Sequence, residues 1–80
     1  MADARQIENV LLEFLRDELL DSSTPVHAES ALDELGIDSF ALLELVIHIE
    51  RACKVTIPAH MLTRENTRSV RTLASAAASC

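Results

Sequence analysis

The chain has 80 residues, enough for one small domain with a modest hydrophobic core. Hydrophobic residues make up 49% of it, yet it has no Trp or Tyr, two Phe, one Gly and two Pro, which favours helices packed on helices and argues against an all-β fold. Twelve acids and two bases give residues 1–50 a charge of −10, whereas five bases and one acid give residues 51–80 a charge of +4. The acidic first half disfavours nucleic-acid binding and favours protein partners with a basic docking surface.

The sequence also argues against several kinds of site. Cys53 and Cys80 make neither a disulfide framework nor a zinc site, and we expect Cys80 to be a mobile thiol. His27, His48 and His60 lack metal-ligand spacing, and no Ser-His-acid or Cys-His arrangement is readable, so we expect neither a metal site nor catalytic residues. Without a signal segment or a membrane-spanning apolar run, the protein is expected to be cytoplasmic, with no membrane contact.

Three segments have apolar residues at the spacing of a buried helical stripe. The first is residues 3–20, with Asp3 as its N-cap, the second is residues 39–53, and the third follows a cap at Thr67 or Ser69. The expected core positions are Ile7, Val10, Leu11, Phe14, Leu15 and Leu19 in the first helix, Leu42, Leu45, Val46, Ile49 and Cys53 in the second, and Val70, Leu73, Ala74 and Ala77 in the third.

The connections between these helices carry signals of their own. Residues 21–38 form a long loop, in which Ser30 and Asp33 resemble a capping box for a helical turn near 30–35 and Gly36 fits a left-handed C-cap. Residues 55–58 read as extended, and a short helical segment is expected around 60–65.

Together these elements predict an all-α fold: a small four-helix bundle with a long loop between the first and second helices. A single domain spans residues 1–80, with its core at about 3–76 and a C-terminal tail at about 77–80.

The second helix carries an additional apolar strip. Phe40, Leu43 and Ile47 lie at i, i+3 and i+7 and share a face with Glu44. Such a strip suits docking of a partner protein. The alternative is that Phe40 and Ile47 fold back onto the long loop near residues 35–37.

The segment Glu34–Phe40 carries the chemistry. It places the carboxylate of Asp38 and the hydroxyl of Ser39 at a helix start, just after the turn at Gly36. Free N–H groups and the helix dipole favour a phosphate there, and Asp38 is suited to assist a Mg²⁺ ion during transfer of a phosphate to Ser39. The simpler alternative is that Asp38 is only an N-cap.

The sequence Leu-Gly-Ile-Asp-Ser-Phe at 35–40, the helix after it and Val-Thr-Ile-Pro at 55–58 closely resemble the acyl carrier and peptidyl carrier protein family. The resemblance covers nearly the whole chain, to about residue 75. It implies a four-helix bundle in which Ser39 accepts 4′-phosphopantetheine from coenzyme A, through a separate Mg-dependent transferase. The arm then carries cargo as a thioester, received from a loading ligase or acyltransferase and passed to biosynthetic enzymes. The Met1 start and short tails favour a freestanding carrier, which we expect to be a monomer.

Some positions depart from the family pattern. Phe40 replaces the usual Leu, Ala41 and Arg51 stand where fatty-acid carriers often have acids, and residues 62–70 form a longer and more basic stretch. These departures favour a carrier of a specialised pathway over housekeeping fatty-acid synthesis. Fatty acyl, polyketide, aryl and aminoacyl cargo all remain open. The competing interpretation is a non-modified helical interaction module that binds a partner through its apolar strip.

Overall fold

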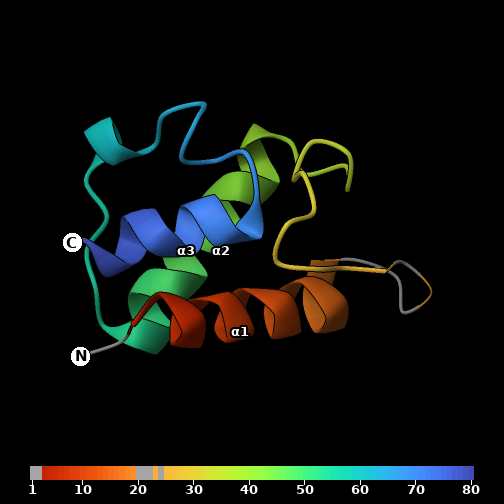
Figure 1. Cartoon of the computed structure of the whole chain (residues 1–80), viewed down its shortest axis with the longest axis horizontal. Helices are drawn as coiled ribbons and strands as arrows, with labels where there is room; N and C mark the ends of the chain where they lie inside the picture. The colour runs from red at the N-terminus through yellow and green to blue at the C-terminus, as the bar shows by residue number, and fades with distance from the viewer. Residues whose placement is uncertain (1–2, 20–22, 24) are drawn as a thin grey trace.

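The computed structural model describes residues 3–19, 23 and 25–80. Its α-helices are α1 (Ala4–Phe14), which continues into a π-helical turn, η1 (Leu15–Leu19), then α2 (Ser39–Cys53) and α3 (Val70–Ala78), with a 3-10 turn, η2 (Ala59–Met61), between α2 and α3. Figure 1 shows α1 and α3 side by side with α2 crossing behind them, and α1 contacts both other helices. The prediction of an all-α fold is confirmed. The expected position 20 of the first helix and positions 21, 22 and 24 of the long loop lie outside the described residues.

The segment between α2 and α3 differs from the expectation of a short helix around 60–65. It forms η2 and then hydrogen-bonded turns at 64–67. The Thr63 hydroxyl accepts from the backbone N–H of Asn66 at 3.1 Å, and the Thr67 hydroxyl donates to the Thr63 carbonyl at 2.8 Å. The Thr67 N–H also donates to the Thr63 carbonyl at 3.0 Å, so Thr63 caps a single helical turn that does not extend into a longer helix.

Each α-helix begins at the cap that its sequence indicates. Asp3 and Asp38 each accept, through Oδ1, from the backbone N–H three residues ahead, at 2.8 and 2.9 Å. Of the two candidates for the third cap, Ser69 is the one used, in a capping box with Thr72. Because caps satisfy donors that have no partner inside the helix, local sequence fixes where these helices start.

The core is the set of stripes that the helical spacing predicts, with small differences. Five predicted core positions are half-buried instead of buried: Val10, Phe14, Leu19, Leu42 and Cys53. The helix α3 runs to Ala78 and Ala77 is fully buried, so the expected end of the core at residue 76 is too early. The buried apolar residues are Ile7, Leu11, Leu15, Val26, Leu32, Leu45, Val46, Ile49, Ile57, Val70, Leu73, Ala74, Ala76 and Ala77.

The long connection between α1 and α2 is held against the start of α3 by backbone hydrogen bonds. The Leu32 N–H donates to the Arg68 carbonyl at 2.9 Å, and the Arg71 N–H donates to the Ala28 carbonyl at 2.8 Å. An isolated antiparallel bridge joins Ala31 and Ser69. The connection therefore follows a fixed path although it contains no long helix.

Two predictions for this connection have different outcomes. The Ser30 hydroxyl accepts from the His27 N–H at 3.0 Å, so it closes the preceding turn, and the predicted capping box with Asp33 is wrong. Gly36 has φ of +82° and is the left-handed residue that ends the turn, as predicted. The N–H groups of Gly36 and Ile37 donate to the carbonyls of Asp33 and Leu32 at 3.1 and 3.0 Å, the bond pattern of a Schellman motif. This turn directs the chain into α2.

The buried face of α2 gives a direct test of the core. Val46→Asp places a carboxylate at a position 6% exposed, and we expect it to cost about 3 kcal/mol or more of the roughly 4–12 kcal/mol available to a domain of this size. Thermal denaturation followed by circular dichroism should show the cooperative transition lost or strongly lowered. Ile47→Asp, the same change at a neighbouring position that is 48% exposed, is the control and should melt near wild type. A wild-type melt for Val46→Asp would mean that α2 packs through another face.

Candidate functional site

Ser39 is the first residue of α2, and its side chain is exposed. The Asp38 carboxylate accepts a hydrogen bond from the Ala41 N–H, and the Asp38 carbonyl accepts from the Leu42 N–H at 2.9 Å. The N–H groups of Ser39 and Phe40 come before the first intrahelical bond, so they and the helix dipole give this end of α2 a positive potential. The hydroxyl of Ser39 is thus placed where an added phosphate is electrostatically favoured.

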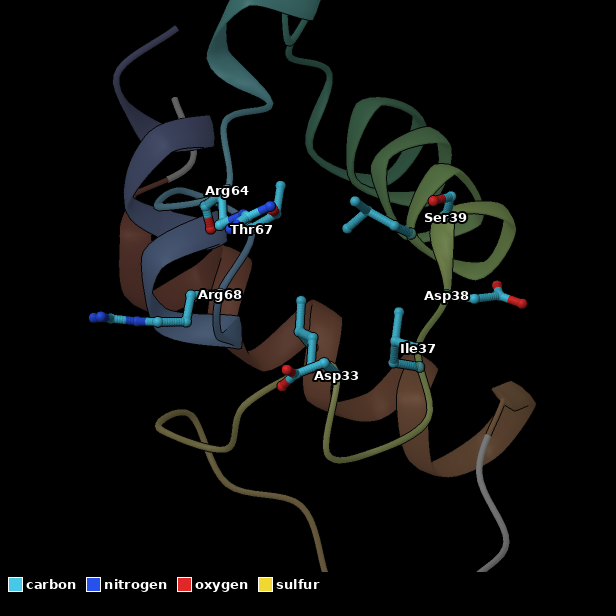
Figure 2. Close-up of a pocket in the computed structure, with 9 residues that line it drawn as sticks. Asp33, Ile37, Asp38, Ser39, Arg64, Thr67 and Arg68 are labelled. Atoms are coloured by element: carbon cyan, nitrogen blue, oxygen red, sulfur yellow. The ribbon is translucent and has the colours of Figure 1, made fainter.

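A cavity of about 380 Å³ lies beside Ser39. Figure 2 shows Ser39 on one wall, with Arg64 and Thr67 on the opposite wall. The residues that line the cavity are Leu32, Asp33, Ile37, Asp38, Ser39, Leu42, Arg64, Thr67 and Arg68. The lining combines aliphatic side chains with charges of both signs.

One carboxylate oxygen of Asp38 accepts a hydrogen bond from the backbone, and the other can still bind a cation. Oδ1 accepts from the Ala41 N–H at 2.9 Å, and the exposed carboxylate points away from the cavity in Figure 2. The cap therefore leaves Oδ2 facing solvent, where a cation brought by another protein can reach it. The N-cap role and a role in cation binding are compatible.

The side chains of the apolar strip on α2 are exposed to solvent. Phe40, Leu43 and Ile47 are 68%, 55% and 48% exposed, and Glu44 on the same face is half-buried. The alternative, in which Phe40 and Ile47 fold back onto the long loop, is therefore wrong. The strip begins at the residue next to Ser39, so a protein that approaches this serine along α2 meets it.

The histidines are dispersed in the fold. His48 stacks on Phe14 with ring centroids 4.1 Å apart, which joins α1 to α2. His27 and His60 are exposed on separate segments. Within the described part of the chain, no group of three or more His, Cys, Asp or Glu side chains is placed to hold a metal ion.

The two cysteines differ in environment. Cys53 packs half-buried against the core, and burial raises the pKa of its thiol, which lowers the thiolate fraction available for reaction. Cys80 is exposed, with Sγ 3.3 Å from the Ala76 carbonyl. Neither cysteine lines the cavity beside Ser39. In residues 3–19, 23 and 25–80, no helix has the length and apolar character needed to span a bilayer.

Sequence reasoning identified the α2 side of this site and missed the opposite wall. Arg64 and Thr67 are 25 or more positions from Ser39 in the chain, and only the fastening of the long connection to the start of α3 brings the two walls together. The available signal was the unusual basic character of residues 62–70, which by itself indicates no neighbour.

Residues 6–77 match the family described as "Phosphopantetheine attachment site". The chain is also 32% identical over 72 residues to Aminoacyl carrier protein 2 of Bradyrhizobium diazoefficiens, an alignment that covers 88% of this chain and 81% of that protein.

Two solved structures from Bradyrhizobium japonicum have similar folds. One is the complex of glycine:carrier protein ligase with glycylated carrier protein, matched with a TM-score of 0.72 and 26% identity over 91% of this chain and 96% of the matched chain. The other is the complex of the ligase with its cognate carrier protein and an analogue of glycyl adenylate, with a TM-score of 0.65, 28% identity, and coverage of 88% and 87%.

The residues present fit the group that this family carries. An exposed serine hydroxyl stands at a helix N-terminus whose first N–H groups are free of intrahelical acceptors, and the cavity beside it is partly basic. Phosphopantetheine supplies a long arm with a terminal thiol, and Ser39 has the exposure that such an attachment needs. With this geometry and a match over residues 6–77, the chain belongs to the phosphopantetheine-binding carrier protein family.

Proposed function

We propose that this protein carries an aminoacyl group as a thioester on a 4′-phosphopantetheine arm attached to Ser39. The observation that carries the assignment is the exposed Ser39 at the first position of α2, directly after the Asp38 cap and inside the family match. A carrier needs its attachment point free of the core, because enzymes must reach both the serine and the end of the arm.

The attachment step places the chemistry on a separate transferase. The Ser39 O–H bond breaks and a new O–P bond forms to the phosphopantetheine phosphorus of coenzyme A. The P–O bond of the diphosphate breaks, so that the nucleotide part leaves with the bridging oxygen. We assign the acceptance of the serine proton to the transferase, since the Asp38 carboxylate is engaged as the cap of α2 and points away from the cavity. Asp38 contributes its free Oδ2 to the Mg²⁺ ion that the transferase holds during transfer.

The surface of Phe40, Leu43, Glu44 and Ile47 is the docking site for the transferase and the loading enzyme. A small apolar strip beside an acid suits a weak contact that releases quickly, which a shuttling carrier requires. The acidic first half of the chain adds steering toward basic partner surfaces. A single chain exposes every element of this surface, so we expect it to act as a monomer.

An aminoacyl cargo is supported by the similar proteins. One similar protein is an aminoacyl carrier, and two similar structures show a carrier with a glycine ligase. By analogy, a ligase transfers the amino acid from its adenylate to the thiol of the arm, with release of AMP. The carrier itself performs no reaction. We further propose that the turns at 59–67 stand in place of the short helix expected in a four-helix carrier bundle.

Modification of Ser39 is tested by intact mass. Wild-type protein incubated with coenzyme A, Mg²⁺ and a broad-specificity phosphopantetheinyl transferase should gain one phosphopantetheine, and Ser39→Ala should gain none. Ser79→Ala, an equivalent change at another exposed serine, is the control and should be modified like wild type. Modification of Ser39→Ala would show that the attachment site is elsewhere, and an unmodified wild type would favour the interaction-module alternative.

The docking role of the strip is tested by reversing its charge. Glu44→Arg should slow turnover by the transferase about 3–10-fold at low salt, because it weakens steering toward a basic partner surface. Its thermal midpoint should stay near wild type, since Glu44 is not part of the core cluster. Glu13→Arg, the same reversal on an exposed position of α1, is the matched control and should affect turnover less. Equal turnover for Glu44→Arg and wild type at low ionic strength would exclude this face as the docking site.

A further inference from the structure

We propose that Arg64 is a positioning residue that holds the phosphodiester formed at Ser39 by pairing with its negative charge. This inference rests on the proposed attachment at Ser39 and adds a role for the basic segment between η2 and α3. The pairing anchors the base of the arm against this segment and so restricts the directions in which the arm can leave the protein.

The first support is placement. Ser39 and Arg64 line the same cavity of about 380 Å³. In Figure 2 the Arg64 and Thr67 side chains overlap on the wall opposite Ser39, whereas the end of the Arg68 side chain points away from α2. Of the two cations that line the cavity, Arg68 is directed away from the attachment side, which leaves Arg64 as the candidate partner of the phosphate.

The second support is that the Arg64 guanidinium makes no ion pair with any residue that the structure describes. Within the part of the chain that the structure describes, ion pairs within 4.0 Å involve only Arg71, which contacts Glu29 at 2.9 Å and Glu8 at 3.9 Å. The Arg64 side chain is exposed and has no hydrogen bond to another described residue. It can bind a new anion without losing an existing partner, and a guanidinium is well suited to the oxygens of a phosphate.

The third support is local charge. A phosphodiester at Ser39 introduces a negative charge beside a cavity that Asp33 and Asp38 already line. The start of α2 offsets part of this repulsion through its N–H groups, and a cation on the opposite wall offsets more.

The backbone that carries Arg64 is held in place. The Asn66 side chain donates to the Met61 carbonyl at 2.8 Å, and the Thr67 hydroxyl donates to the Thr63 carbonyl at 2.8 Å. The Arg68 carbonyl accepts from the Leu32 N–H at 2.9 Å, which ties this wall to the long connection. The wall that carries Arg64 is therefore held by hydrogen bonds on both sides of this residue.

The experiment compares apo and phosphopantetheinylated forms of wild type, Arg64→Gln, Arg64→Lys and Arg68→Gln. Arg68→Gln is the matched control, since it removes the same charge from the same segment. Intact mass first establishes the modification of each variant, which we expect to be complete for all four. Far-UV circular dichroism of the apo forms checks the fold, and the exposed position makes Arg64→Gln a mild change.

Three readouts that need no cargo enzyme then report the contact. In wild type, modification should shift the Arg64 Nε–Hε resonance, and the phosphorus resonance of the arm should differ from that in Arg64→Gln. At low salt, the change in thermal midpoint on modification should be about 2–4 °C less favourable in Arg64→Gln than in wild type. This difference should vanish near 1 M NaCl, where the screening length is about 3 Å. Arg64→Lys should fall between the two, and Arg68→Gln should match wild type.

Identical phosphorus resonances and midpoint changes in wild type and Arg64→Gln would overturn the inference, as would an equal loss in Arg68→Gln, which would indicate a general charge effect. Either result leaves the attachment at Ser39 intact if the mass increase is present. Failure of wild type to gain the arm would overturn the proposed function, and this inference with it.

Discussion

The site depends on the fastening of the long connection to the start of α3. Two backbone hydrogen bonds, from Leu32 to Arg68 and from Arg71 to Ala28, join the connection to this point, and Leu32 is buried beneath them. The bond from Arg71 also satisfies one of the N–H groups that the first turn of α3 leaves without an intrahelical partner. Because the connection is fixed there, the turn at Gly36 delivers Ser39 opposite the wall that carries Arg64. The cavity beside the serine is a consequence of that fastening.

The helix α2 meets two demands on opposite faces. Leu45, Val46 and Ile49 bury one face in the core. In a chain of 80 residues this core is small, so each buried side chain contributes a large share of the stability. Phe40 and Ile47 leave apolar surface exposed, although burying them would add stability. The docking role proposed for this strip accounts for the exposed apolar surface, since a contact that forms and releases needs a small accessible patch.

Local signals were sufficient for much of the fold. Asp3, Asp38 and Ser69 cap their helices because each needs only a backbone N–H three residues ahead. Gly36 ends a turn for a similarly local reason, its tolerance of positive φ. Local reasoning was wrong at Ser30, whose hydroxyl accepts from the preceding His27 N–H. It was also inexact around 60–65, where η2 and a single turn capped by Thr63 stand in place of one short helix. A serine or threonine hydroxyl can bond to backbone groups on either side of it, so the local sequence does not fix which bond forms.

The sequence alone therefore determined the starts of α1 and α2, most of the buried stripes and the serine at the start of α2, since each follows from periodicity, a cap or a turn within a few residues. It left open two caps for α3 and the exposure of the apolar strip, which the structure resolved. The family resemblance of the segment around Ser39 belongs to the same local information, and the match over residues 6–77 confirms the family. Only the tertiary structure decided that Arg64 and Thr67 face Ser39 and that the charge of Arg71 is taken by Glu8 and Glu29. These contacts join positions far apart in the chain, and their geometry depends on how the long connection packs, which no local pattern encodes.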